Sequence, residues 1–278
     1  MPPDICILQN PTPRELVQSL RQKIARLEGT RRPTSEVPVS SGCRPVDKLL
    51  PGQGFRRGTL VEWLARGPGS GVESLALLAA REASREGGAL VVFDRTEEFY
   101  PPAAIRLGID PQGMIVVQVP EKGTGPFCRH GPRPTSGWYP ASHKMDLSPF
   151  PTRSDFLWAL DQALRCPAVA AVLAWPEELD GRTFRRLQLA AEQGGGLGLF
   201  VRPERARHEP SWAEVRLVVE PLPATAPDAP RRLKVELLRC RGGPSGASVE
   251  VELDDETHPL HPASRRAHPA TRRRAAGA

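Results

Sequence analysis

Short apolar runs and amphipathic segments alternate along the middle of the chain. The apolar runs have the length of buried strands and lie at 59–64, 89–94, 114–119, 169–174 and 197–202. The segments between them carry apolar side chains at three- and four-residue steps, as helices packed on one side do, and lie at 72–86, 102–107, 154–165 and 181–193. This alternation predicts an α/β fold: a mostly parallel sheet with helices on both faces.

The pattern changes after Ser211. Three strand-like runs, 212–220, 231–241 and 247–253, follow one another with only turns between them. Strands joined by short turns pair antiparallel, whereas parallel neighbours need a longer crossover connection. The C-terminal part therefore predicts an antiparallel extension at one edge of the sheet.

A separate amphipathic helix is predicted over residues 12–28, so that residues 1–37 form an N-terminal helix and a linker. The apolar side chains of this helix repeat at helical spacing and form one stripe: Leu16, Leu20, Ile24 and Leu27. Two interpretations stay open. The stripe packs on the chain's own core, or it contacts a partner.

Residues 121–151 interrupt the alternation and are rich in Gly, Pro, Ser and His. A stretch of this length without secondary structure is uncommon inside a domain and is usually functional or disordered. We expect a disordered insertion. Cys128, His130 and His143 lie in it without the spacing of a zinc site, so no metal is expected.

Composition sets the class of protein. The 278 residues suit one large α/β domain with appendages, with the core over 38–257. The five cysteines are scattered and include no C-x-x-C pair, so reduced thiols are expected rather than a disulfide framework. The sequence shows neither a secretory leader nor an apolar run of membrane-span length, which predicts a cytoplasmic protein without a membrane partner.

Excess positive charge is concentrated in the C-terminal tail, residues 258–278. The tail has five arginines and no acidic residue, and without these five the 38 basic residues of the chain fall to 33 against 32 acidic ones. We expect this tail to be disordered. Two roles stay open: salt-sensitive attraction to nucleic acid through Arg272, Arg273 and Arg274, or solubility alone.

A glycine-rich loop joins the first predicted strand to the first core helix. Its residues are Arg66, Gly67, Pro68, Gly69, Ser70, Gly71, Val72 and Glu73. In a P-loop, backbone N–H groups hold the phosphates, a Lys follows the last glycine, and the next hydroxyl binds magnesium. Here Val72 stands at the Lys position, and Glu73, which would repel phosphate, stands at the hydroxyl position. The pattern indicates a degenerate nucleotide-binding loop.

The order of these segments resembles the RecA recombinase family. The beginning of the recombinase core is similar to the stretch SSGCRPVDKLLPGQGFRRGTLVEWLARGPGSG. The next strand and helix of the recombinase are similar to ALVVFDRTEEFYPPAAIRLGID. Its final strands are similar to WAEVRLVVEP and RRLKVELLRCRGG. A closer resemblance is to the ImuA family of RecA-like accessory proteins, on CPAVAAVLAWPEELDGRTFRRLQLAAEQGGGLGLFVRP. Both resemblances imply a RecA-like P-loop NTPase core.

The resemblance also locates the remaining catalytic positions. The family's catalytic glutamate falls on Thr96, with Glu97 one residue further on, and its Walker B aspartate falls on Ala174 or Trp175. Together with the degenerate loop, these replacements predict a pseudo-ATPase, not an enzyme, with no cofactor and no small-molecule substrate. Weak binding of nucleotide by the backbone N–H groups of the loop stays open.

The resemblance to ImuA implies an adaptor in SOS-type DNA damage tolerance and translesion synthesis. It implies as partners an ImuB-like inactive Y-family polymerase, an error-prone DNA polymerase, the RecA filament and DNA. For protein partners the chain offers the N-terminal stripe, the antiparallel edge around 233–238 and the tail. For DNA it offers Arg205, Arg207 and His208, although a solvated turn is an equal reading. Two other functions stay open: a divergent, active RecA-type DNA-dependent ATPase, and a SulA-like cell-division inhibitor.

Overall fold

The computed structural model describes most of the core. The described residues are 37–95, 98–118, 153–176, 178–223, 229–243, 245–253 and 260–262. The predicted N-terminal helix, the predicted insertion and most of the predicted basic tail lie outside them.

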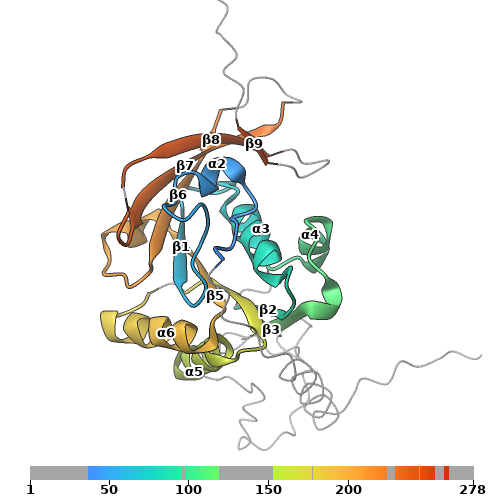
Figure 1. Ribbon diagram of the computed structural model, residues 1–278, viewed down its shortest axis with the longest axis vertical. Coiled ribbons are helices and arrows are strands. Elements are labelled where there is room, and N and C mark those ends of the chain that lie inside the picture. Colours follow the sequence, from blue (N-terminus) through green and yellow to red (C-terminus); the bar gives the residue numbers. More distant parts are fainter. Residues whose placement is uncertain are drawn as a thin grey trace, which may run out of the picture.

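One sheet runs through the described core (Figure 1). Its parallel strands are β1 (Leu60–Ala65), β2 (Ala89–Asp94), β3 (Met114–Gln118), β4 (Val169–Ala174), β5 (Leu197–Pro203) and β6 (Val215–Leu222). Its antiparallel strands are β7 (Arg231–Cys240), β8 (Ser248–Leu253) and β9 (Leu260–Pro262). In the described part of the chain the order is β3-β2-β4-β5-β1-β6-β7-β8-β9. The predicted α/β class with an antiparallel C-terminal extension is confirmed.

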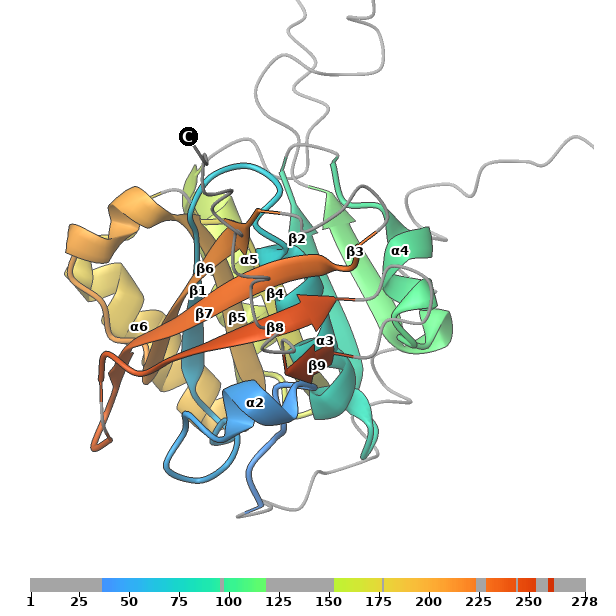
Figure 2. The same ribbon diagram turned by 90° about the horizontal axis from the view of Figure 1, so that it is seen from above.

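Helices cover both faces of the parallel strands, as predicted (Figures 1 and 2). The path from β1 to β2 and on to β3 carries α3 (Val72–Ser84), α4 (Pro101–Arg106) and the short 3₁₀-helix η1 (Pro111–Gly113). The path back through β4 to β5 carries α5 (Arg153–Arg165) and α6 (Gly181–Gly194). Crossovers are right-handed, so helices on connections that run in opposite directions along the sheet lie on opposite faces.

Local sequence sets the ends of α6. The Asp180 carboxylate accepts hydrogen bonds from the N–H groups of Arg182 and Thr183, both at 2.9 Å, and so caps the helix N-terminus. Gly195 follows the helix with a φ of 76°, a left-handed conformation that glycine adopts without strain. These two residues explain why the amphipathic pattern begins and ends where it does.

Each face of the sheet has its own apolar cluster. On the α3 face, Trp63 of β1 packs edge-on against Phe55, with 5.9 Å between the ring centroids. On the other face, Phe184 of α6 meets Phe200 of β5 at 6.0 Å. Burying a side chain of this size contributes about 1.5–3 kcal/mol relative to leaving it exposed. The sheet is therefore anchored from both sides.

The antiparallel strands are inclined to the parallel ones (Figure 2). Strands β8 and β9 contact a short helix, α2 (Arg44–Asp47). The sequence pattern did not predict this helix. Strand β7 lies between β6 and β8, and its side chains Leu233, Val235 and Leu237 are buried. The prediction of an antiparallel edge around 233–238 is therefore wrong, because these residues lie within the sheet. The boundary predicted for the tail, residue 258, is also too early. Strand β9 lies within the predicted tail and pairs with the outer side of β8.

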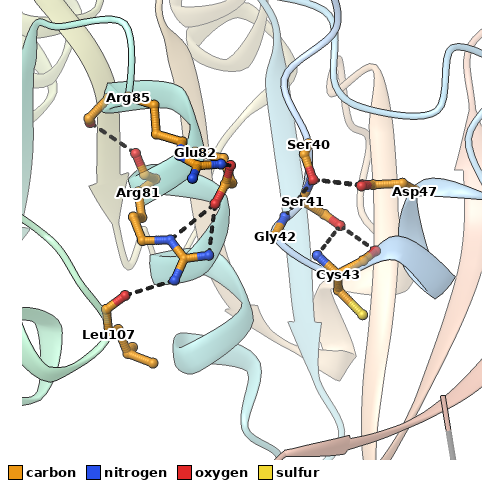
Figure 3. A network of polar contacts seen from close by, with 11 residues as sticks. Ser40, Ser41, Gly42, Cys43, Asp47, Arg81, Glu82, Arg85 and Leu107 are labelled. Carbon is orange, nitrogen blue, oxygen red and sulfur yellow. Dashed lines mark hydrogen bonds and ion pairs between the residues drawn. The ribbon is translucent and has the colours of Figure 1, made fainter. Parts of the chain in front are cut away.

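A carboxylate fastens the segment before β1 to the core (Figure 3). Asp47 of α2 accepts hydrogen bonds from the Ser40 hydroxyl at 2.6 Å and from the Ser41 N–H at 2.7 Å. Gly42 has a φ of 79°, and a Cβ at this position would lie 2.9 Å from the Cβ of Leu78. Glycine therefore allows this segment to pack directly on α3.

A second polar network in Figure 3 joins α3 to the end of α4. Arg81 donates to the Leu107 carbonyl at 3.0 Å and to the Glu82 carboxylate at 2.7 Å. Glu82 also accepts from Arg85 at 2.8 Å. These contacts hold α4 beside α3 on one face of the sheet.

A buried ionic cluster lies under the connection from β5 to β6. This connection covers the sheet with a 3₁₀-helix rather than an α-helix. The connection from β5 to β6 passes over β1 and contains η2 (Glu204–His208). Beneath it, Glu62 of β1 has no exposed surface. Its carboxylate pairs with Arg202 of β5 at 2.7 Å and with Arg216 of β6 at 2.6 Å. Arg216 also donates to two main-chain carbonyls of η2, at 2.7 and 3.2 Å.

Two further arginine contacts complete this cluster. Arg202 also pairs with Glu209, which follows η2. Arg239 of β7 donates to the Ala213 carbonyl at 2.7 Å. Burial, and then the neighbouring Arg216, lower the pKa of Arg239. Arginines of β5, β6 and β7, two of them paired with Glu62 of β1, thus hold the crossover on the sheet.

Replacing the central carboxylate should destabilise the protein strongly. Glu62→Ala leaves two buried guanidinium groups without their shared partner, and we expect the free energy of unfolding to fall by about 3–5 kcal/mol in urea denaturation. The control is Arg56→Ala, which breaks a pair with Glu214 in which Arg56 is 67% exposed and should cost less than about 1 kcal/mol. Equal losses in the two variants would show that the cluster does not hold the crossover.

Candidate functional site

The degenerate loop lies at the carboxyl end of β1, the edge at which ligands bind in open α/β sheets. Its glycines all have positive φ, at 86° for Gly67, 67° for Gly69 and 72° for Gly71. Gly71 directly precedes α3. The loop thus has a backbone turn into a helix N-terminus, the arrangement that places N–H groups around a phosphate.

The two residues after the loop have different surroundings. Val72 is completely buried in the apolar cluster on the α3 face. Glu73 is exposed in the first turn of α3, where the helix dipole favours a negative charge. Apolar packing therefore replaces the ammonium group of a P-loop, and an exposed carboxylate replaces its hydroxyl.

Arg66 connects the loop to two carboxylates. Its guanidinium group pairs with Glu204 of η2 at 2.7 Å and with Glu220 of β6 at 2.8 Å. Hydrogen bonding to Glu204, which outweighs the effect of burial, raises the pKa of Arg66. Arg231 of β7 donates to the Gly69 carbonyl at 2.9 Å. The charge of Arg66 is thus balanced by the protein's own carboxylates.

The ends of β4 and β2 lie beside this loop. At the Walker B position, Ala174 is fully buried, and Trp175 follows with its ring centroid 6.4 Å from that of Phe99. At the end of β2, the carboxylate of the buried Asp94 accepts hydrogen bonds from the N–H groups of Glu98 and Phe99, at 3.3 and 3.1 Å. These bonds stabilise the turn that follows β2. Outside the described residues lie Thr96 and Glu97.

A cavity of about 820 Å³ opens next to the loop. Its wall is formed by α3, α4, η2 and the ends of β2, β4 and β5. Much of the wall is aliphatic or aromatic: Leu77, Phe99, Tyr100, Leu107, Trp175 and Val201. The sequence pattern did not predict this cavity, although the aromatic residues that follow β2 and β4 were a signal for it.

The residues predicted for DNA contact lie on η2. Arg205, Arg207 and His208 are exposed, whereas Ala206 is buried between them. Arg207 lies 4.0 Å from Glu236 of β7. The segment is a short turn fixed from below, and DNA contact by its side chains stays a prediction. Outside the described residues lie Arg272, Arg273, Arg274, Leu16, Leu20, Ile24 and Leu27.

Metal-binding clusters and membrane-spanning helices are both absent from the described part of the chain. There, no group of three or more His, Cys, Asp or Glu side chains is arranged to hold a metal ion. None of the helices among these residues is long and apolar enough to cross a membrane. Cys43 is a buried free thiol whose pKa is raised by burial to about 11, which makes it unreactive at neutral pH.

Comparison with known proteins gives long matches to ImuA proteins and shorter matches to RecA proteins. Over 256 residues the chain is 30% identical to Protein ImuA of Caulobacter vibrioides, covering 84% of this chain and 90% of that protein. It is 40% identical over 86 residues to Protein RecA of Chlorobaculum parvum, covering 31% of this chain and 24% of that protein. No family model matches the chain.

Among solved structures, the crystal structure of the RadB recombinase is similar in fold. The TM-score is 0.55 at 15% sequence identity, covering 81% of this chain and all of that one. At this identity the likeness concerns the fold alone. These matches confirm both resemblances that the sequence predicts.

Two glycine substitutions test the packing of the loop. Both Gly67→Ala and Gly71→Ala place a side chain at positive φ, at a cost of about 1–2 kcal/mol. At position 71 the new Cβ would also lie 2.8 Å from Cδ1 of Leu233, whereas at 67 nothing lies within 4 Å. We expect Gly71→Ala to lose about 1–3 kcal/mol more in urea denaturation. Equal losses would show that β7 does not pack against the loop.

Proposed function

The chain belongs to the ImuA family, and from this premise we propose that it is a non-catalytic RecA-like adaptor in SOS-type DNA damage tolerance. In this role it supports error-prone translesion synthesis in the bacterial cytoplasm without turning over nucleotide. Its direct partner, as the family resemblance implies, is an ImuB-like inactive relative of the Y-family polymerases. That partner acts together with an error-prone DNA polymerase.

The observation that carries the non-catalytic part is the charge of the loop. The Lys position is a buried valine, Val72, and the next residue presents a carboxylate, Glu73. The remaining cation, Arg66, is paired with two carboxylates. Charge-assisted hydrogen bonds supply much of the affinity for phosphate. Backbone N–H groups alone therefore support at most weak binding of a nucleotide.

The adaptor part is supported by family membership together with the intact core. A fold does not by itself imply a function, because one fold serves many sites. In the described region this chain keeps a RecA-like sheet of parallel strands with helices on both faces, while the residues at the phosphate-binding positions are replaced. A scaffold that keeps its shape and loses its reaction chemistry suits binding rather than turnover.

Contact with DNA or with a RecA filament is a further part of this proposal. Arg205, Arg207 and His208 face solvent on the fixed turn η2. Basic side chains held in this way can contact phosphates without reading bases. Such contacts weaken as the salt concentration rises.

Nucleotide binding is the first test. Calorimetry with magnesium and ATP should show no saturable binding up to about 1 mM, and a phosphate-release assay should equal its protein-free blank. The control variant is Gly69→Asp, because Asp tolerates positive φ and nothing lies within 4 Å of a Cβ there. Wild-type turnover that this variant abolishes would contradict the proposal and support an active ATPase.

Partner binding is the second test. The full-length chain, immobilised, should capture a co-expressed ImuB-like polymerase relative from the same organism, because the proposed role requires this contact. Capture should not change on addition of ATP or in Gly69→Asp, since the proposed contact needs no nucleotide. The absence of a complex, or a complex that forms only with ATP, would count against the adaptor role.

A further inference from the structure

The cavity beside the loop has the size and lining of a binding pocket. Its volume of about 820 Å³ lies within the range of about 300–1,000 Å³ that is usual for ligand sites. Leu77 of α3, Phe99 before α4 and Trp175 after β4 line it from three parts of the fold. Tyr100, also on the wall, is 67% exposed. Exposed aromatic side chains are enriched where proteins bind one another.

A phosphate group matches this cavity poorly. The nearest loop cation, Arg66, is paired with Glu204 and Glu220. Glu73 contributes a carboxylate to the wall, and like charges repel. The cavity lies at the edge where this topology usually binds ligands, but beside the loop Glu73 and the paired Arg66 leave no free cation for a phosphate among the described residues.

The wall favours a cation instead. Four carboxylates line it, those of Glu73, Asp94, Glu98 and Glu204. Glu204 is paired with Arg66 and Asp94 holds the turn after β2, so Glu73 is the carboxylate that a bound cation would meet. Two of the guanidinium groups that line it are engaged elsewhere: Arg202 is paired with Glu62, and Arg95 lies over the ring of Phe156 at 5.6 Å. In the described part of the chain, the exposed carboxylate of Glu73 has neither an ion pair nor a hydrogen bond.

Arg205 on η2 adds a second kind of contact. It lines the same cavity, is exposed, and has no partner for its side chain among the residues that the structure describes. A guanidinium group in this position can donate to a main-chain carbonyl. A bound polypeptide offers that carbonyl, whereas a small aromatic cation does not.

We propose that this cavity is the docking pocket for a polypeptide segment of the chain's protein partner. The segment places a bulky apolar side chain against Leu77, Phe99 and Trp175. A neighbouring Lys or Arg of the segment lies next to Glu73, and one of its main-chain carbonyls accepts from Arg205. The inference rests on the proposed function, since it gives the adaptor's partner a binding site beside a loop that has lost its phosphate-binding charges.

Two matched dipeptides test this chemistry. The full-length chain is titrated with N-acetyl-Trp-Lys-amide and with N-acetyl-Trp-Glu-amide, and binding is followed by NMR. We expect the lysine dipeptide to bind about threefold more tightly, a preference of the size that one exposed ion pair gives. Glu73→Lys should reverse this preference. Equal binding of the two by the wild type, or binding of neither, would overturn the proposal.

A cavity-filling variant and its control locate the binding. Ala103 of α4 is exposed and lines the cavity, so Ala103→Trp fills it from the surface. Ile105→Trp places the same side chain on the same helix, at an exposed position that does not line the cavity. We expect the first to weaken dipeptide binding by at least about tenfold and the second to leave it unchanged. An equal effect of both variants, or displacement of the dipeptide by magnesium and ATP, would overturn the proposal.

Partner capture separates this inference from the proposed function. Ala103→Trp should capture at least about tenfold less of the partner than the wild type does, while Ile105→Trp captures as much. Full capture by Ala103→Trp would overturn the docking pocket and leave the adaptor role standing. A wild type that prefers the lysine dipeptide but captures no partner would contradict the adaptor role and still support the preference of the pocket.

Discussion

A single buried carboxylate constrains how the centre of this sheet can be assembled. Glu62 lies within β1 without exposed surface, and leaving its charge unpaired there would cost about 3–5 kcal/mol. Arg202 and Arg216 pair with it from β5 and β6, the strands on either side. The connection between these two strands then closes over the charges. Three strands and η2 therefore depend on one another for their stability.

The same connection reaches the loop at the end of β1. Glu204 of η2 and Glu220 of β6 hold Arg66, and Leu233 of β7 lies against Gly71. In a phosphate-binding loop, the cations bind the ligand and the space above the loop holds it. Here the protein's own carboxylates pair with the cation Arg66, and the apolar side chain of Leu233 fills space next to Gly71. Burial of apolar surface stabilises the fold, and the loss of the phosphate-binding charges does not change that buried surface.

Periodicity predicted the long elements of the core because the stripe of a helix and the apolar run of a strand are local in sequence. It did not predict α2, since a helix of four residues has no stripe and is held by the contacts of Asp47 with Ser40 and Ser41. The prediction of an antiparallel edge around 233–238 was wrong, and β9 was not predicted, for the same reason. Whether a strand is an edge depends on which later segment pairs with it.

The sequence by itself determined what the loop lacks, because Val72 and Glu73 are identities that folding cannot change. Only the tertiary structure decided what the loop gained. Arg66 meets Glu204 and Glu220, which are 138 and 154 residues away along the chain. The cavity likewise exists only because the crossovers bring α3, α4 and η2 to one edge of the sheet. A residue type is a local property, whereas the partner of a charge and the shape of a cavity follow from the path of the whole chain.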